Sequence, residues 1–263
     1  MTIRKSAVSG TFYPNDCEEV RHYIEHFTKT MPNMSCHATP RALIVPHAGY
    51  IYSGFTANLA YNLVASKRPD ITRVVVLGPS HRVALEGASI ALYDAFQTPC
   101  GNIVIDTNFS QELKNRFEFI HFVPDAHNEH STEVQMPFIH HYFPQASVIE
   151  LVYGQIASEA LSGLIDVLLK DEETLVVVST DLSHFYTQKD AMALDNVCIK
   201  AIDARNLDVL DECEACGIIG VKALVTSALT NDLQPHFLDH RTSFERSKDA
   251  SNVVGYTAFV FTH

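Results

Sequence analysis

Residues 73–81 of the chain read Arg-Val-Val-Val-Leu-Gly-Pro-Ser-His, and the fold class can be argued outward from this stretch. Its four consecutive aliphatic residues, closed by a Gly-Pro turn signal, are typical of a strand that is buried on both faces. Three more aliphatic runs have the same character, at 41–45, 147–152 and 174–179. Strands of this kind favour a sheet with helices packed on each side.

Helical patterns lie between these strands. Apolar residues recur every three or four positions in 55–66 and in 158–170, as on one face of a helix. Strands that alternate with helices predict an α/β domain with a partly parallel sheet. Further elements are expected as helices at 187–204, 206–214 and 220–230, a hairpin over 88–105 with strands at 89–92 and 103–105, and a last strand over 253–260. The central sheet should therefore be mixed but mostly parallel, with flanking helices, and residues 1–263 should form a single domain.

The chain is acidic. Its 31 Asp and Glu residues outnumber 19 Lys and Arg residues, which gives a formal net charge of −12. Such a charge repels a phosphate backbone or an anionic membrane surface, so neither nucleic acid nor a membrane is an expected partner. The apolar runs are far shorter than the roughly 20 residues that cross a bilayer. No apolar signal segment follows the start, and we therefore expect a cytoplasmic protein.

The six cysteines stand at 17, 36, 100, 198, 213 and 216. They are few and scattered for a chain of this size, so the thiols should be reduced rather than joined in a disulfide framework. Cys213 and Cys216 form a single C-x-x-C in a segment that reads as helical. Without a second pair, such a motif favours buried thiols over a zinc or redox site, and the second alternative stays open.

Histidines follow three of the predicted strands. His47 comes after the strand at 41–45, His81 closes the stretch quoted above, and His184 follows the strand at 174–179. In an open α/β sheet the ligand crevice lies beyond the carboxyl ends of the strands, so these side chains can converge. Imidazole binds Fe, Zn and Cu, and two histidines with a carboxylate leave positions open for substrate or oxygen. Each histidine alone reads as an ordinary loop residue, but three equivalent positions favour a metal site.

Acidic residues accompany these histidines. Asp181 precedes His184 by three positions and could tune its imidazole, or it could cap the segment that follows. Glu129 and His130 stand at the entrance of a predicted helix, with Glu133 in its first turn. Helix capping explains Glu133 but not the pair before it. Glu129 and His130 are therefore candidates, together with Asp181 and His184, for general acid/base chemistry.

Several motifs resemble the MEMO family in order and spacing, over almost the whole chain. They are Gly10-Thr11-Phe12-Tyr13-Pro14, Pro46-His47-Ala48-Gly49-Tyr50 with Tyr52-Ser53-Gly54, Gly78-Pro79-Ser80-His81, Glu129-His130-Ser131 with Glu133, Ser179-Thr180-Asp181 with His184, Cys216-Gly217 and Val254-Gly255-Tyr256. In bacteria and archaea this family is known as AmmeMemoRadiSam system protein B. The resemblance implies association with an AMMECR-type protein and a radical SAM protein.

The resemblance also implies a fold shared with class III extradiol ring-cleavage dioxygenases, which hold non-haem Fe(II) with two histidines and a carboxylate. His47 and His81 match the metal positions of those enzymes, and His184 matches their acid/base histidine. Animal members complete a copper or iron site with a cysteine near the C-terminus, whereas residues 241–249 contain none. Glu245, Asp249 or His184 are left as the third ligand, and isolation without metal is compatible with this open position.

The expected function is therefore that of a MEMO-like protein with a histidine-rich pocket at its strand ends. One hypothesis is a non-haem Fe(II)- or Cu-dependent oxidoreductase, similar to a dioxygenase, that acts on an unknown small substrate. The alternative is a non-catalytic binding or accessory protein that works with the AMMECR-type and radical SAM proteins.

Overall fold

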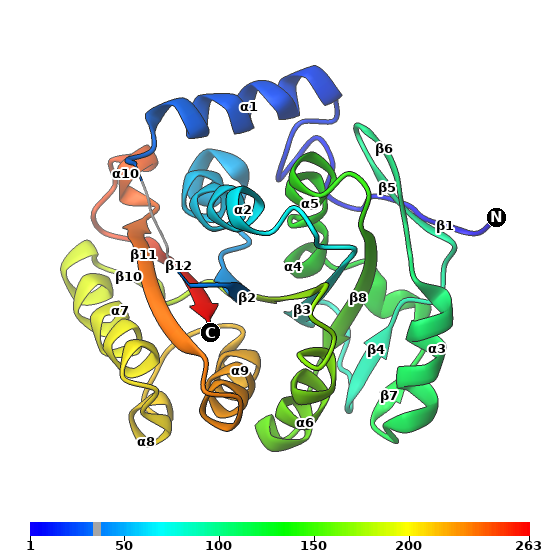
Figure 1. The fold of residues 1–263 in the computed structure, drawn as a ribbon. Coiled ribbons are helices and arrows are strands. Elements are labelled where there is room, and N and C mark those ends of the chain that lie inside the picture. Colours follow the sequence, from blue (N-terminus) through cyan, green and yellow to red (C-terminus); the bar gives the residue numbers. More distant parts are fainter. Residues whose placement is uncertain (34–37) are drawn as a thin grey trace.

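The four predicted buried strands form the middle of one large sheet in the computed structural model, which describes residues 1–33 and 38–263 (Figure 1). They lie side by side in the order β2 (Pro40–Val45), β9 (Thr174–Ser179), β3 (Arg73–Pro79) and β8 (Ser147–Tyr153). All three pairings between them are parallel. The carboxyl ends of the four strands therefore share one edge of the sheet.

Antiparallel strands extend this sheet on both sides. Next to β2 lies β12 (Val253–Thr262), which also pairs with β10 (His184–Tyr186) and β11 (Gln234–Thr242). Next to β8 lie β4 (Ala88–Ile90) and then β7 (Ile120–His121). The sheet is mixed, as predicted. The sequence of β11 shows no strand pattern, because its residues are largely polar and few of them are buried.

Helices cover both faces of the sheet and enclose two hydrophobic cores (Figure 1). One face carries α1 (Cys17–Thr30), α2 (Phe55–Lys67) and α5 (Met136–Tyr142); the other carries α6 (Ser158–Leu168), α7 (Gln188–Asp203), α8 (Leu207–Leu210) and α9 (Ile218–Thr230). The remaining helices are η1 (Tyr50–Gly54), α3 (Thr107–Arg116), η2 (Pro124–His127), α4 (His130–Glu133) and α10 (Phe244–Ser247). This arrangement confirms the predicted α/β fold of the class III extradiol dioxygenase type. Within the described ranges, no helix combines the length and apolar character that a bilayer crossing needs.

The predicted hairpin is correct in its turn but wrong in one of its strands. The hairpin consists of β5 (Ala95–Thr98) and β6 (Gly101–Val104), and β1 (Ile3–Arg4) adds to β5 in a small separate sheet. The segment expected to pair with 103–105 instead forms β4 and pairs with β8 in the large sheet. Its buried residues complete that sheet, which a local pattern of residues could not reveal.

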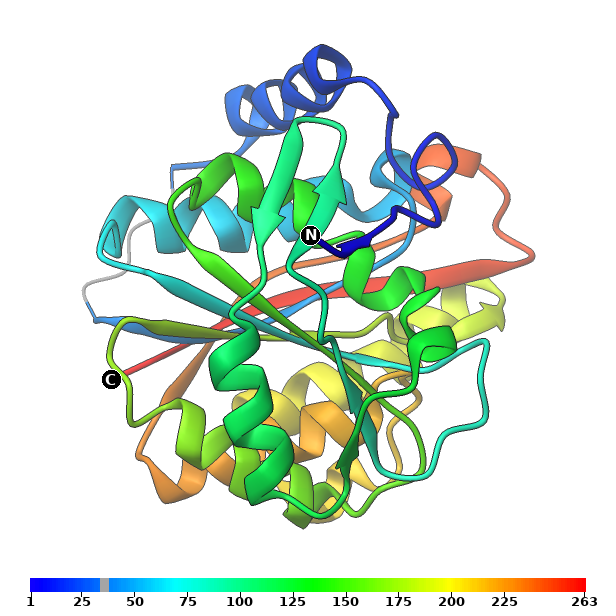
Figure 2. The same cartoon turned by 90° about the vertical axis from the view of Figure 1, so that its right-hand side faces the viewer.

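A disulfide joins Cys17, at the start of α1, to Cys100, in the turn of this hairpin. Figure 2 shows the hairpin reaching from the sheet to α1. The expectation of reduced thiols is therefore wrong for these two residues. They are 83 positions apart in the sequence, and only the packing of the hairpin against α1 brings their Cα atoms to 4.7 Å. Cys198, Cys213 and Cys216 are free, as expected, and Cys36 lies outside the described residues.

Removal of this disulfide should destabilise the protein. We expect the double substitution Cys17→Ser and Cys100→Ser to lower the free energy of unfolding by about 2–4 kcal/mol, because the cross-link restricts the unfolded chain over a long loop. Urea unfolding of the oxidised wild type and the double variant measures the difference. The control is the reduced wild type, which should unfold like the variant; equal midpoints for the oxidised wild type and the variant would contradict the expectation.

Candidate metal site

The loops that follow β2, β3 and β9 bring together His47, His81 and Asp181 at the carboxyl edge of the sheet. The rings of His47 and His81 lie 5.3 Å apart, although their strands are separated by β9 in the sheet. Asp181 is buried and accepts a hydrogen bond of 2.8 Å from the backbone N–H of His47. The carboxylate therefore fixes the position of the loop that carries His47.

A third imidazole in this cluster belongs to His130. Its ring lies 4.6 Å from that of His81 and 5.3 Å from that of His47, and it packs on Phe12 at 4.8 Å. His130 is the first residue of α4, and Glu129 is the N-cap of this helix, so the predicted helix entrance is correct. The structure thus places Glu129 and His130 beside His47 and His81.

Glu129 orients two of the imidazoles. One of its oxygens accepts the backbone N–H of His81, and the other lies 3.1 Å from Nδ1 of His81 and 2.8 Å from Nδ1 of His130. Burial disfavours the charged carboxylate, but hydrogen bonds from His130 and His81 outweigh it and hold the pKa of Glu129 far below its usual value. An ionised carboxylate only accepts, so Nδ1 of both rings is the donor. Each ring then directs its Nε2 away from Glu129.

The tautomer of His47 follows from its own hydrogen bonds. Its Nδ1 lies 3.0 Å from Oγ of Ser179, whose single proton is donated to the carbonyl of Ser131. The Ser179 oxygen also accepts from the side-chain amide of Gln135. Because Ser179 has no second proton, Nδ1 of His47 must be the donor. Its Nε2 therefore carries a lone pair, and burial lowers the pKa of His47 well below its usual value, which keeps the ring neutral.

This lone pair faces a thiol. Sγ of Cys216 lies 3.2 Å from Nε2 of His47, in the loop that leads into α9. The loop is held to Asp181, whose carbonyl accepts the N–H of Cys216 and whose N–H donates to its sulfur. Burial, together with the nearby charge of Asp181, raises the pKa of Cys216 to about 12. The side chain is thus a neutral thiol in the absence of a cation.

One ligand atom from each of His47, His81 and Cys216 can be chosen so that all lie within 4.8 Å of one another. A tetrahedral ion with bonds of about 2.0 Å to nitrogen and about 2.3 Å to sulfur holds those two atoms about 3.5 Å apart. The observed 3.2 Å between His47 and Cys216 is close to that value. Both imidazoles are fixed through Nδ1, by Ser179 and by Glu129, as metal-bound histidines usually are. These residues fit a metal ion.

A second group, His81, Glu129 and His130, also meets the distance criterion. It has the two-histidine, one-carboxylate composition of the non-haem iron enzymes. However, the oxygens of Glu129 already accept the hydrogen bonds described above, and one of them also accepts the backbone N–H groups of His130 and Ser131. A carboxylate engaged in this way is better suited to orient imidazoles than to bind a cation itself.

His184 and Asp181 have different surroundings from those the sequence suggested. Nδ1 of His184 donates to the carbonyl of Leu182 at 2.7 Å, so its Nε2 can accept a proton. Asp181 is directed to the His47 loop, and burial raises its pKa although the nearby His184 lowers it. Neither His184 nor Asp181 belongs to the two groups of described residues whose ligand atoms lie close enough together to bind one metal ion. The arrangement leaves His184 suited to proton transfer beside the cluster.

Glu245 and Asp249, the candidate third ligands near the C-terminus, do not belong to either of these two groups. Glu245 in α10 and Asp249 after it are both exposed, and the carboxylate of Asp249 accepts hydrogen bonds from Ser251. The structure offers Cys216 in their place. The single C-x-x-C predicts a buried thiol at Cys216, whereas the Cys216-Gly217 motif is the sequence signal that points to this residue as a ligand.

Phe185, next to His184, occupies the left-handed region with φ of 67°, while 75% of its surface is exposed. A bulky residue in this conformation costs about 1–2 kcal/mol. We expect Phe185→Asn to raise the free energy of unfolding by about 0.5–1 kcal/mol, because asparagine tolerates this conformation. Urea unfolding measures the change. Phe185→Ala is the matched control, since alanine keeps the strained conformation; an equal gain in both variants would refute backbone strain as the cause.

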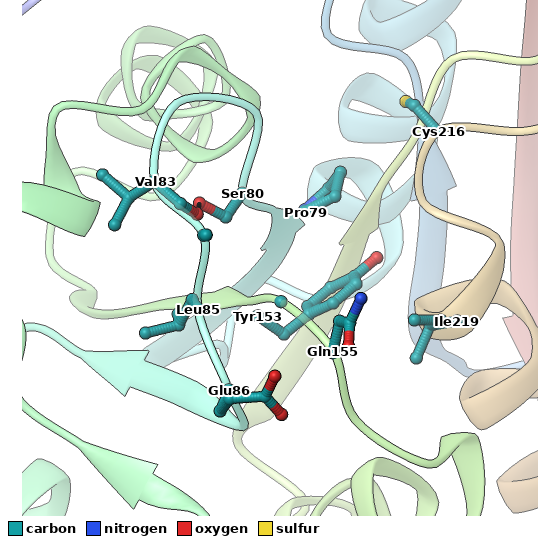
Figure 3. A pocket seen from close by; sticks show the side chains of 11 residues that line it. Pro79, Ser80, Val83, Leu85, Glu86, Tyr153, Gln155, Cys216 and Ile219 are labelled. Atoms are coloured by element: carbon teal, nitrogen blue, oxygen red, sulfur yellow. Dashed lines mark hydrogen bonds between the residues drawn. The ribbon is translucent and has the colours of Figure 1, made fainter.

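A pocket of about 390 Å³ is lined in part by Cys216 (Figure 3). It lies between the loop that follows β3, the end of β8 and the first turn of α9. Cys216 lines this pocket and contacts His47, so the pocket and the candidate metal site share this residue.

The chain is similar to known proteins over nearly its whole length. The family model described as Memo-like protein matches residues 4–260. A MEMO1 family protein of Aquifex aeolicus is 31% identical over 99% of this chain and 100% of its own length. One from Sulfolobus acidocaldarius is 33% identical over 98% of this chain and 99% of its own, and one from Metallosphaera sedula is 32% identical over the same shares. The similarity spans nearly every element of the fold, and the chain belongs to the family of Memo-like proteins.

Proposed function

We propose that His47, His81 and Cys216 bind one copper or iron ion, and that the protein is a metal-dependent oxidoreductase acting on a small molecule in the adjoining pocket. The observation that carries this proposal is the tautomer of His47, whose lone pair faces the thiol of Cys216 at 3.2 Å. Copper(I) prefers soft thiolate ligands, whereas hard cations prefer oxygen ligands. A site of two imidazoles and one thiolate therefore suits copper(I).

When bound, such an ion would supply Lewis-acid and one-electron chemistry at the edge of the pocket. The chain contributes orientation and proton transfer. Glu129 holds His81 and His130, and Ser179 holds His47, so the imidazoles need not reorganise. Nε2 of His184 is available to take a proton from a substrate, because its Nδ1 is engaged with Leu182.

Anaerobic titration of the protein with copper(I), iron(II) and zinc(II) tests the proposal, followed by oxygen consumption of the loaded protein with pools of small metabolites. We expect one equivalent of copper(I) or iron(II) to bind tightly with release of the Cys216 proton, so the affinity should fall as the pH is lowered. Tight binding of zinc alone, or no binding, would overturn the proposed redox function.

A specific observation also favours a binding function as the second candidate. Three apolar side chains in the segments that follow β2 and β9 are exposed: Phe185 at 75%, Ile51 at 46% and Tyr52 at 38%. Exposed apolar residues mark an interaction site where they form one contiguous patch. We propose that these three residues form one surface that contacts a protein partner, and that the candidate partners are an AMMECR-type protein and a radical SAM protein. Co-purification with wild type but not with a Phe185→Asn and Tyr52→Ser variant would support it; equal capture by both would refute it.

A further inference from the structure

The pocket beside Cys216 has walls that are formed by close backbone packing. The loop that follows β3 lies against the end of β8, where a Cβ on Gly154 would come within 1.9 Å of the carbonyl of Leu85. On the opposite wall, a Cβ on Gly220 would come within 2.5 Å of the hydroxyl of Tyr153. These contacts leave little room for the walls to move, so the pocket is already formed in the free protein.

Most polar groups around this pocket are already paired. The N–H groups of Gly87 and Gln155 donate to the carbonyls of Gln155 and Leu85. The hydroxyl of Ser80 donates to Val83, and that of Tyr153 donates to the carbonyl of Gly217. These groups have little capacity left for a ligand.

Two side chains of the lining differ. Glu86 and Gln155 are opposite each other in a backbone bridge, both are exposed, and no side-chain hydrogen bond joins either of them to the described residues. Glu86 is the only charged residue among the described residues that line this pocket. Figure 3 shows both residues toward one end of the pocket and Cys216 at the other. A ligand would therefore meet a carboxylate and an amide at one end and the candidate metal site at the other.

The negative charge of Glu86 indicates which class of ligand this pocket binds. A carboxylate at the mouth and a formal net charge of −12 on the chain repel anions and attract cations. The intervening wall is apolar, with Leu85, Tyr153 and Ile219. We infer that this pocket binds a small organic amine, with its ammonium on Glu86 and Gln155, its apolar body along this wall, and its far end at Cys216. The amine would react at the end that lies at Cys216, and this inference rests on the proposed function only for that point.

Calorimetric titration with three probes of matched size tests the inference: 2-phenylethylamine, 2-phenylethanol and phenylacetate. We expect the amine to bind at least tenfold more tightly than the alcohol, and phenylacetate not to bind. Glu86→Gln should weaken amine binding about tenfold and leave alcohol binding unchanged, because only the amine loses a charge-assisted hydrogen bond. Glu112→Gln, on α3, is the control for a loss of overall charge and should bind the amine like the wild type.

Equal binding of the amine and phenylacetate would overturn the inference, as would unchanged amine binding in Glu86→Gln or no binding of the amine. The titrations are made on metal-free protein, so their outcome does not depend on the proposed metal site. Conversely, Glu86→Gln should bind copper(I) like the wild type. Failure of metal binding with retained amine binding would therefore overturn the proposed function alone, and the reverse result would overturn only the ligand class.

Discussion

Alanine in place of Cys216 or His47 should weaken the binding of copper(I) or iron(II) by at least about 100-fold, because each substitution removes one of three ligands from a site that must bind a dehydrated cation. Nε2 of His47 and the thiol of Cys216 lie 3.2 Å apart, so both would contribute to the same site. Anaerobic titration against a chromophoric chelator measures the affinity, and circular dichroism establishes that the variants are folded.

Cys213→Ala is the matched control. Cys213 belongs to the same C-x-x-C, but its thiol donates to the carbonyl of Val209 and it is absent from the converging groups of described residues. This variant should bind metal like the wild type. If Cys216→Ala also binds like the wild type while Glu245→Ala or Asp249→Ala does not, the third ligand comes from the C-terminal segment and the assignment of Cys216 is refuted.

Replacement of Arg4 by methionine should lower the free energy of unfolding by about 3–5 kcal/mol, because it leaves buried carboxylates without their cation. Arg4 is buried, pairs with Glu133 and Glu150, and lies over the ring of Phe96. Glu133 also accepts the N–H groups of Ala7 and Val8, and thus ties the N-terminal segment to α4. Urea unfolding at neutral pH measures the loss.

The effect should depend on pH in a defined direction. Burial alone raises the pKa of Glu150, but Arg4 and His127 outweigh it, so its folded pKa is lower than the usual value. The corresponding stabilisation is present above the usual pKa and is lost as the pH falls below it toward the folded value. The difference between wild type and Arg4→Met should therefore shrink in acid.

Arg73→Met is the control for this prediction. Arg73 also pairs with two carboxylates and lies over a phenylalanine ring, but it is partly exposed. Solvent screens such pairs, and the loss should be no more than about 1 kcal/mol. Equal losses in the two variants would show that burial does not decide the effect.

The sequence by itself determined the centre of the fold. The aliphatic runs at 41–45, 73–78, 147–152 and 174–179 each became a buried strand, because consecutive branched residues specify an element that is covered on both faces. Parallel order then placed the loops with His47 and His81 at one edge. The entrance of α4 at Glu129 and His130 was also visible locally, since helix capping depends on neighbouring residues.

The tertiary structure alone decided which side chains meet. Cys216 reaches His47, and Cys17 reaches Cys100, only because α9 and the β5–β6 hairpin pack where they do. His130, rather than His184, completes the ring contacts with His47 and His81. Residues so distant in sequence leave no joint pattern along the chain. Their proximity follows from the order of strands and the packing of helices, which depend on the whole hydrophobic core.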